Sequence, residues 1–247
     1  MKAKVKAIII SWLGWGWLPS ALFQFRRRIR NRLWSSDPGR VCVDVGSGTG
    51  LTSIEKAIQW PNTNFYCIDV NKGELVKGQA LSTALGIKNI AFICGDACNL
   101  PFKKGTANTI IAANILLGTH DIKATLLEWS KVMSRQSTMI IETPIAPQKH
   151  ILFKSNAIKN FVKHQVDPYH GFVDGELENF LQLIDFKPIQ RLPVFHGAGV
   201  LARECHYMLT GMHPLLSAIF WLPLYLMTIT GQETGRGNAV TLIAERS

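Results

Sequence analysis

The chain has 247 residues, of which 47% are hydrophobic and 18% are charged, and this composition excludes an intrinsically disordered protein. Twenty-seven basic against 17 acidic residues give a formal net charge of +10 at pH 7. The excess lies in the first 40 residues, which hold nine Lys and Arg and a single acid, Asp37. The basic end therefore predicts an anionic partner, either lipid or nucleic acid, for a body that is itself nearly neutral.

Short apolar runs alternate with helix-like segments after a boundary at Asp37-Pro38-Gly39. This order predicts an α/β fold with a doubly wound, mostly parallel, seven-stranded sheet and helices on both faces. The expected strands are Val41–Val45, Asn64–Ile68, Ile90–Cys94, Thr109–Ala113, Thr138–Ile141, Ile189–Phe195 and Ala239–Ala244. The expected helices are Thr52–Trp60, Lys72–Leu85, Ile122–Met133 and Glu176–Ile184.

A glycine-rich turn, VDVGSGTG over residues 43–50, follows the first expected strand and precedes a helix. Glycine at such a turn permits unusual dihedrals and a close approach of backbone N–H groups to a ligand. A dinucleotide fingerprint needs G-x-G-x-x-G, whereas this turn has Gly46, Gly48 and Gly50 followed by Leu51. The spacing therefore disfavours a nicotinamide-dependent dehydrogenase.

Three acidic residues fall where strands of the predicted sheet end. Asp44 precedes the glycine turn, Asp69 ends the second strand, and Asp96 follows the third. These positions line one crevice at the carboxyl edge of an open α/β sheet. Carboxylates there suit ribose hydroxyls, an exocyclic amino group and a cationic amino acid moiety, although Asp is also common at strand ends for purely structural reasons.

The segments DVGSGTG, YCIDVN and ICGDACNLPF together resemble the class I S-adenosylmethionine-dependent methyltransferase family, with its Rossmann-like fold. The later segment THDIKATLLEWSKVMS is similar to the branch that contains the ubiquinone and menaquinone methyltransferases. The resemblance spans about residues 40 to 145 and implies a methyltransferase that uses S-adenosyl-L-methionine. It implies a cofactor site formed by Asp44, Gly46, Ser47, Gly48, Gly50, Asp69, Val70, Asp96, Ala97 and Asn114.

Within that site, the resemblance implies that the three glycines pack on the methionine part of the cofactor, that Asp69 binds the ribose and that Asp96 approaches the adenine. Two features depart from related patterns. Ser134 to Ser137 replaces the usual glycine turn before the fifth strand, and Asn114 lacks the Pro-Pro-aromatic sequel of enzymes that methylate amides and adenines.

Methyl transfer from a sulfonium is an in-line displacement, so alignment is essential and a general base is optional. The run Asp167–Phe172 places His170 beside an aromatic residue in a loop, and we assign His170 as the candidate base, with a packing role as the alternative. His120-Asp121 is interpreted instead as a helix start, with Asp121 as the N-cap.

Five cysteines do not form a pattern of metal ligands or disulfides, so we expect no metal site and a reducing compartment. Cys42, Cys67 and Cys94 lie inside apolar runs and are expected to be buried.

Two uncharged stretches predict membrane association. Ala7–Phe25 precedes RRRIRNR, and Cys205–Gln232 lies between the last two expected strands. The second is too short for two crossings of roughly twenty residues each, so it is expected to dip into one leaflet; a buried hairpin or a dimer interface is the alternative. The first is expected to lie at the interface, with Arg26–Arg32 on anionic lipid; a spanning helix and a signal peptide are the alternatives.

These features predict residues 1–36 as a membrane-associating segment and residues 37–247 as a methyltransferase domain with an apolar insertion at about 198–236. We expect the protein at the cytoplasmic face of a membrane, acting on a hydrophobic small molecule or lipid such as a quinone or isoprenoid. The alternatives are an RNA methyltransferase tethered by its basic arm and a non-catalytic binding protein of the same fold.

Overall fold

The computed structural model describes residues 37–147, 171–194, 198–212, 220, 223–224, 226–227 and 239–246. The predictions for Ala7–Phe25, for Arg26–Arg32, for His170 and for most of Cys205–Gln232 lie outside these residues. Among the helices that the structure describes, none combines the length and the apolarity that a membrane crossing requires.

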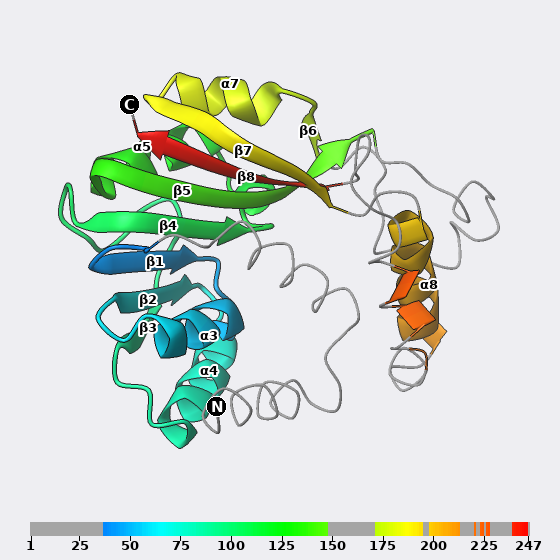
Figure 1. Cartoon of the computed structure of the whole chain (residues 1–247), viewed down its shortest axis with the longest axis horizontal. Helices are drawn as coiled ribbons and strands as arrows, with labels where there is room; N and C mark the ends of the chain where they lie inside the picture. The colour runs from blue at the N-terminus through cyan, green and yellow to red at the C-terminus, as the bar shows by residue number, and fades with distance from the viewer. Residues whose placement is uncertain are drawn as a thin grey trace.

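One sheet forms the centre of the molecule, with strand order β3-β2-β1-β4-β5-β8-β7 (Figure 1). All neighbours are parallel except β8, which runs antiparallel to β5 and to β7. The strands are β1 Val41–Val45, β2 Asn64–Asp69, β3 Ile90–Cys94, β4 Ala107–Ala113, β5 Met133–Ala146, β7 Phe186–Val194 and β8 Ala239–Arg246.

The expectation of seven strands is wrong, because the sheet has eight. The additional strand β6 (Phe172–Val173) pairs in parallel with Ile145 and Ala146 at the end of β5. This pairing exists because β5 continues five residues beyond the expected end at Ile141, and a two-residue strand carries no periodicity from which to predict it. The predicted α/β class, the mostly parallel sheet and the flanking helices are confirmed.

Helices lie on both faces of the sheet. On one face, α3 (Leu51–Gln59) and α4 (Lys72–Ala84) pack on β2 and β3. On the other, α5 (Ile122–Val132) and α7 (Glu176–Gln182) pack on β5, β6 and β7. A 3₁₀ turn, η1 (Leu116–Gly118), follows β4.

The helix starts follow from local capping chemistry. Asn71 caps α4, its side-chain oxygen accepting from the N–H groups of Gly73 and Glu74. Asp121 caps α5 by accepting from Ala124 N–H at 2.9 Å, which confirms the predicted role of Asp121. His120, beside it, is exposed.

Two apolar cores lie against the two faces of the sheet. The larger, on the α5 side, contains Trp129 and Leu126 of α5, both 0% exposed, packed on Ile110 and Ile141 of the sheet. The smaller, on the α3 side, contains Cys42, Ala57, Phe65, Ile111, Ile140, Val194, Ala239 and Ile243. Burial of each large side chain contributes about 1.5–3 kcal/mol, so these cores fix the positions of the strand ends.

Cys42 and Cys67 are buried as predicted, whereas the prediction for Cys94 is wrong. Cys94 is exposed because it is the last residue of β3, which is the edge strand of the sheet.

The long connections from β5 to β6 and from β7 to β8 both leave from the carboxyl edge of the parallel strands, since β5 and β7 end there and β8 begins there. Helix α8 (Ala198–Met212) follows β7 and stands on the side to which the arrowheads of β1 and β4 point (Figure 1). Its Ala202 packs with Leu224 in a small apolar cluster of its own.

Candidate active site

The carboxyl ends of four strands bring the predicted site residues together. In register, Val45 of β1 pairs with Ile68 of β2 and Ala112 of β4, while Asp69 of β2 pairs with Cys94 of β3. Residues that follow these positions therefore share one edge. The chain order reverses between β1 and β4, and such a switch point is where open α/β sheets bind ligands.

The glycine turn is fixed by backbone hydrogen bonds to the neighbouring strand. Gly46 N–H and Ser47 N–H both donate to the carbonyl oxygen of Ile68, at 2.8 and 3.0 Å. Gly46, Gly48 and Gly50 have φ of 67°, 55° and 66°, a left-handed conformation that side chains disfavour. The turn therefore keeps one shape, which a ligand meets preformed.

The three glycines have different surroundings. A Cβ at Gly46 would lie 2.6 Å from the side chain of Ile115, and a Cβ at Gly50 would lie 2.7 Å from Sγ of Cys67. At Gly48 a Cβ would meet nothing within 4 Å. Gly46 and Gly50 thus permit close packing inside the protein, and Gly48 is the one of the three that faces open space.

Asp69 connects the turn to β2 and α4. Its Oδ2 accepts from Gly48 N–H at 2.7 Å, and its Oδ1 accepts from Asn71 N–H at 2.8 Å. The next residue, Val70, is 71% exposed, which leaves an apolar side chain uncovered beside a half-buried carboxylate. An exposed apolar surface next to a hydrogen-bond acceptor suits a nucleoside, with its flat base and its ribose hydroxyls.

Asp96 begins the next turn along the edge. Gly95 N–H donates to the carbonyl oxygen of Asp69 at 3.1 Å, so the turns after β2 and β3 are in contact. The Asp96 side chain is exposed and accepts from Cys98 N–H at 2.9 Å. Ala97 is 9% exposed, and its carbonyl oxygen accepts from the indole Nε1–H of Trp129 at 2.8 Å.

Asp44 lies beneath the turn and is 5% exposed. Its Oδ2 accepts from Ser53 Oγ at 2.7 Å, which ties β1 to α3. Burial raises the pKa of the Cys42 and Cys67 thiols, and the Asp44 carboxylate raises both further. Neither thiol is therefore suited to act as a nucleophile at neutral pH.

Asn114 follows β4 with φ of 58° and an exposed side chain. Its N–H donates to the Glu142 carbonyl oxygen at 2.7 Å, and its Nδ2 lies 3.4 Å from Glu142 Oε1. Glu142 is a carboxylate 1% exposed in the middle of β5. The structure thus places all ten predicted cofactor residues at one edge, whereas His170 lies outside the described residues.

Sequence reasoning missed three residues that hold this edge in place. Ser53 supports Asp44, Glu142 lies against Asn114, and Ile115 covers Gly46. Trp129 of α5 also supports the edge, since its indole N–H donates to the carbonyl oxygen of Ala97 in the turn after β3. No periodicity or motif marks contacts between residues so far apart in the chain.

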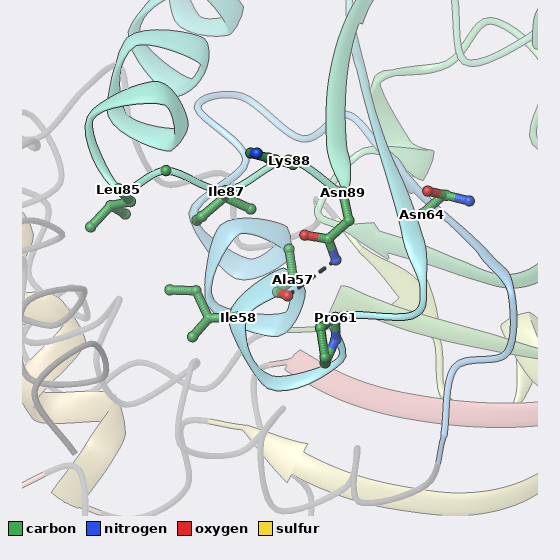
Figure 2. A pocket seen from close by; sticks show the side chains of 9 residues that line it. Ala57, Ile58, Pro61, Asn64, Leu85, Ile87, Lys88 and Asn89 are labelled. Atoms are coloured by element: carbon green, nitrogen blue, oxygen red, sulfur yellow. Dashed lines mark hydrogen bonds between the residues drawn. The ribbon is translucent and has the colours of Figure 1, made fainter.

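Two hollows lie at the opposite, amino edge of the sheet. The first, of about 530 Å³, is lined by residues of α3, of the Leu85–Asn89 connection and of β2 (Figure 2). Asn89 Nδ2 donates there to the carbonyl oxygens of Ala57, Trp60 and Thr63, so its role is to close the end of α3. The second, of about 900 Å³, is lined by Lys104, Arg135 and Arg246 among others.

Comparison with known proteins agrees with this geometry. Residues 36–190 match a family model described as a methyltransferase domain. A demethylmenaquinone methyltransferase from Corynebacterium urealyticum is 28% identical over 135 residues, 53% of this chain and 54% of that protein. A ribosomal RNA small subunit methyltransferase G from Parabacteroides distasonis is 36% identical over 55 residues, 22% of this chain and 24% of that protein. The chain thus spans about half, or less, of the length of these relatives.

Among solved structures, a SAM dependent methyltransferase from Aquifex aeolicus superposes with a TM-score of 0.59. It is 13% identical, and the match covers 92% of each chain, which supports the fold. The family model covers more than half of the chain, in the region that carries the glycine turn and the three acids. Three predictions made from its motifs are confirmed at the level of the family: the class I assignment, the enzyme class and S-adenosyl-L-methionine as cofactor. The chain belongs to the methyltransferase domain family.

Proposed function

We propose that this chain transfers a methyl group from S-adenosyl-L-methionine to a hydrophobic small molecule or lipid at the cytoplasmic face of a membrane. The observation that carries methyl transfer is the convergence of Gly48, Asp69 and Asp96 at one sheet edge, joined by the Gly48–Asp69 and Gly95–Asp69 hydrogen bonds. In this proposal, residues 37–247 are the catalytic domain and residues 1–36 and about 198–236 contact the membrane.

The described residues fit the cofactor. Gly48 faces open space and Val70 is 71% exposed, so both are free of covering side chains where a nucleoside would lie. Asp69 would hold the ribose hydroxyls and Asp96 would approach the adenine. In this proposal Ser47, Ala97 and Asn114 complete the cofactor site, and the Asp44 carboxylate beneath the turn would attract the cationic amino acid part of the cofactor.

When bound, S-adenosyl-L-methionine supplies a methyl group that is already activated as a sulfonium. The chain then has to bind, to orient the acceptor in line and to exclude water. The stiff turn and the buried Trp129–Ala97 contact provide a fixed cofactor site. For an acceptor that carries a proton, we propose His170 as the base.

The membrane contact is supported by where the apolar insertion joins the sheet. It leaves β7 and returns to β8 at the carboxyl edge, the edge that carries the glycine turn. Two of its described apolar side chains, Phe220 and Leu226, are each 46% exposed. Apolar surface in this place suits a bilayer from which a hydrophobic acceptor enters the site directly. A quinone or an isoprenoid has that chemistry, and one relative is a demethylmenaquinone methyltransferase.

An RNA acceptor is the second candidate, because a ribosomal RNA methyltransferase is among the relatives and the groove with Lys104, Arg135 and Arg246 is basic. That groove lies at the amino ends of β4 and β5, whereas the cofactor residues lie at the carboxyl ends. The seven residues of β4 separate the two by roughly 23 Å. RNA held in the groove would therefore be far from the methyl group, and the hydrophobic acceptor is favoured.

The test is calorimetry on the full chain in detergent, followed by labelling. The unmodified protein should bind S-adenosylhomocysteine, and Asp69→Ala should weaken binding at least about tenfold, the equivalent of 1.4 kcal/mol. The control Glu74→Ala removes a carboxylate that pairs with Lys77 on the outer surface of α4 and should leave affinity unchanged. Membranes and total RNA are then incubated with methyl-labelled cofactor. Failure of the unmodified protein to bind refutes the proposal, and label in RNA alone refutes the lipid substrate.

A further inference from the structure

A buried carboxylate, Glu142, lies directly beside the candidate cofactor site. It is 1% exposed and belongs to the carboxyl half of β5, where it pairs in register with Ala113, the last residue of β4. The next residue of the chain after β4 is Asn114, whose side chain is exposed. Removing a carboxylate from water is unfavourable unless it is hydrogen-bonded, so the groups around Glu142 indicate what it does.

Glu142 holds Asn114 at two points. The backbone N–H of Asn114 donates to the carbonyl oxygen of Glu142 at 2.7 Å, and Asn114 Nδ2 donates to Glu142 Oε1 at 3.4 Å. Asn114 has a left-handed φ of 58°, a conformation that asparagine tolerates better than most residues. One residue of β5 therefore orients both the backbone and the side chain of Asn114.

This contact decides which end of the Asn114 amide faces the site. An ionised carboxylate only accepts hydrogen bonds, so the amide has to turn its nitrogen toward Glu142. The amide oxygen, Oδ1, then points away from Glu142. Because the Asn114 side chain is exposed and its Oδ1 makes no hydrogen bond to any residue that the structure describes, this oxygen is available to a ligand.

Asn114 lies beside the glycine turn. Val45 and Ala112 are register partners at the ends of β1 and β4, so the chain leaves both strands side by side. The residue after Asn114 is Ile115, and a Cβ at Gly46 would lie 2.6 Å from its Cγ1. In the proposed function the methionine part of the cofactor rests on this turn. An available amide oxygen beside it suits the α-ammonium group, which only donates hydrogen bonds.

We propose that Glu142 is a positioning residue, which holds the amide nitrogen of Asn114 so that Oδ1 of Asn114 accepts a hydrogen bond from the α-ammonium group of the cofactor. The inference rests on the proposed function and adds to it a residue nearly 100 positions from the glycine turn. Glu142 acts through Asn114 and does not touch the cofactor. Without the carboxylate, the amide is free to present its nitrogen, and a second donor opposes the ammonium.

A double-mutant cycle on the full chain in detergent tests this, with calorimetry of two ligands. S-adenosylhomocysteine carries the ammonium, and 5′-methylthioadenosine lacks the amino acid part. Asn114→Ala should weaken binding of S-adenosylhomocysteine at least about tenfold, and that of methylthioadenosine less than about twofold. Glu142→Gln, whose amide pairs with Asn114 in either orientation, should weaken S-adenosylhomocysteine at least about threefold. Added to Asn114→Ala, it should change affinity by less than about 1.5-fold.

Thr241→Val is the matched control. Thr241 is the register partner of Glu142 on β8, and its buried hydroxyl has no hydrogen-bond partner among the residues that the structure describes, so affinity should not change. Should Glu142→Gln not fold, Glu142→Asp takes its place in the cycle, because it keeps the charge and withdraws the carboxylate by one methylene.

The outcomes separate this inference from the proposed function. An effect at Glu142 that persists in the Asn114→Ala background, or that is equal for the two ligands, overturns the positioning role. So does binding of S-adenosylhomocysteine by the unmodified protein that Asn114→Ala leaves unchanged, and in that case the proposed function stands. Failure of the unmodified protein to bind either ligand refutes the proposed function, and this inference with it.

Discussion

Gly78 allows α4 to approach the glycine turn more closely than any other residue would permit. It lies in the middle of the helix, and a Cβ there would be 2.3 Å from the carbonyl oxygen of Thr49 and 2.5 Å from Cε1 of Phe92. Backbone that close cannot rotate away as a flexible side chain would. We therefore expect Gly78→Ala to push α4 and the turn apart.

Two opposing effects set the size of the change. Alanine raises helix propensity over glycine by about 1 kcal/mol, and overpacking costs about 1–3 kcal/mol. Because the obstructing atom is backbone, the cost should lie in the upper part of that range, for a net loss of about 1–2 kcal/mol. In a chain of this size that loss corresponds to a fall in Tm of about 2–8 °C.

Thermal unfolding and calorimetry with S-adenosylhomocysteine measure the two consequences together. Affinity should fall along with Tm, since Thr49 belongs to the turn that we propose binds the cofactor. Gly118→Ala is the matched control, because its Cβ would meet nothing within 4 Å, and it should leave both quantities unchanged. A Gly78→Ala protein as stable as the control, with unchanged affinity, would refute the packing argument.

Three further substitutions test other parts of the fold. Asn89→Ala removes the three hydrogen bonds at the end of α3 and should lower the free energy of unfolding by about 1–3 kcal/mol, without changing calorimetric affinity for S-adenosylhomocysteine. Gln136→Gly relieves the strain of a left-handed backbone conformation, with φ of 57°, and should raise Tm in a scanning experiment by about 2–4 °C. A fall in Tm would show that the Gln136 side chain itself stabilises the start of β5. Burial raises the pKa of the Cys42 thiol, so the thiol loses its proton at lower pH in the unfolded chain than in the folded chain. The contribution of Cys42 to the free energy of unfolding is therefore intact below pH 9.0 and declines above it. In denaturant titrations, the free energy of unfolding should fall less from pH 8 to pH 10 for Cys42→Ala than for the unmodified protein. An equal fall in both proteins would contradict the assignment of this pH dependence to the Cys42 thiol.

Patterns confined to short segments predicted much of the fold. The strands at Val41–Val45 and Ile90–Cys94 have the predicted bounds, and Asp121 is the N-cap it was expected to be. The glycine turn and the acids at 44, 69 and 96 lie at one edge because parallel strands all end on the same side.

The remainder depends on contacts between distant segments. Strand β5 begins five residues before the expected start, because Met133 already pairs with Ala107 and residues 134–137 form a bulge between that pair and Thr109–Thr138. The bond from Trp129 to Ala97 and the burial of Glu142 arise only when helix, turn and strand meet. Tertiary packing sets such features, and local propensity does not.

The antiparallel pairing of β7 and β8 makes the segment between them an interchangeable module. Val194 and Ala239 are register partners, so the intervening residues depart and return at adjacent points of one sheet edge. Lengthening them leaves the pairing of β7 with β8 in place, and the loop-closure entropy grows only slowly with loop length. A different segment could therefore be inserted here while the glycine turn and the turns after β2 and β3 stay in place.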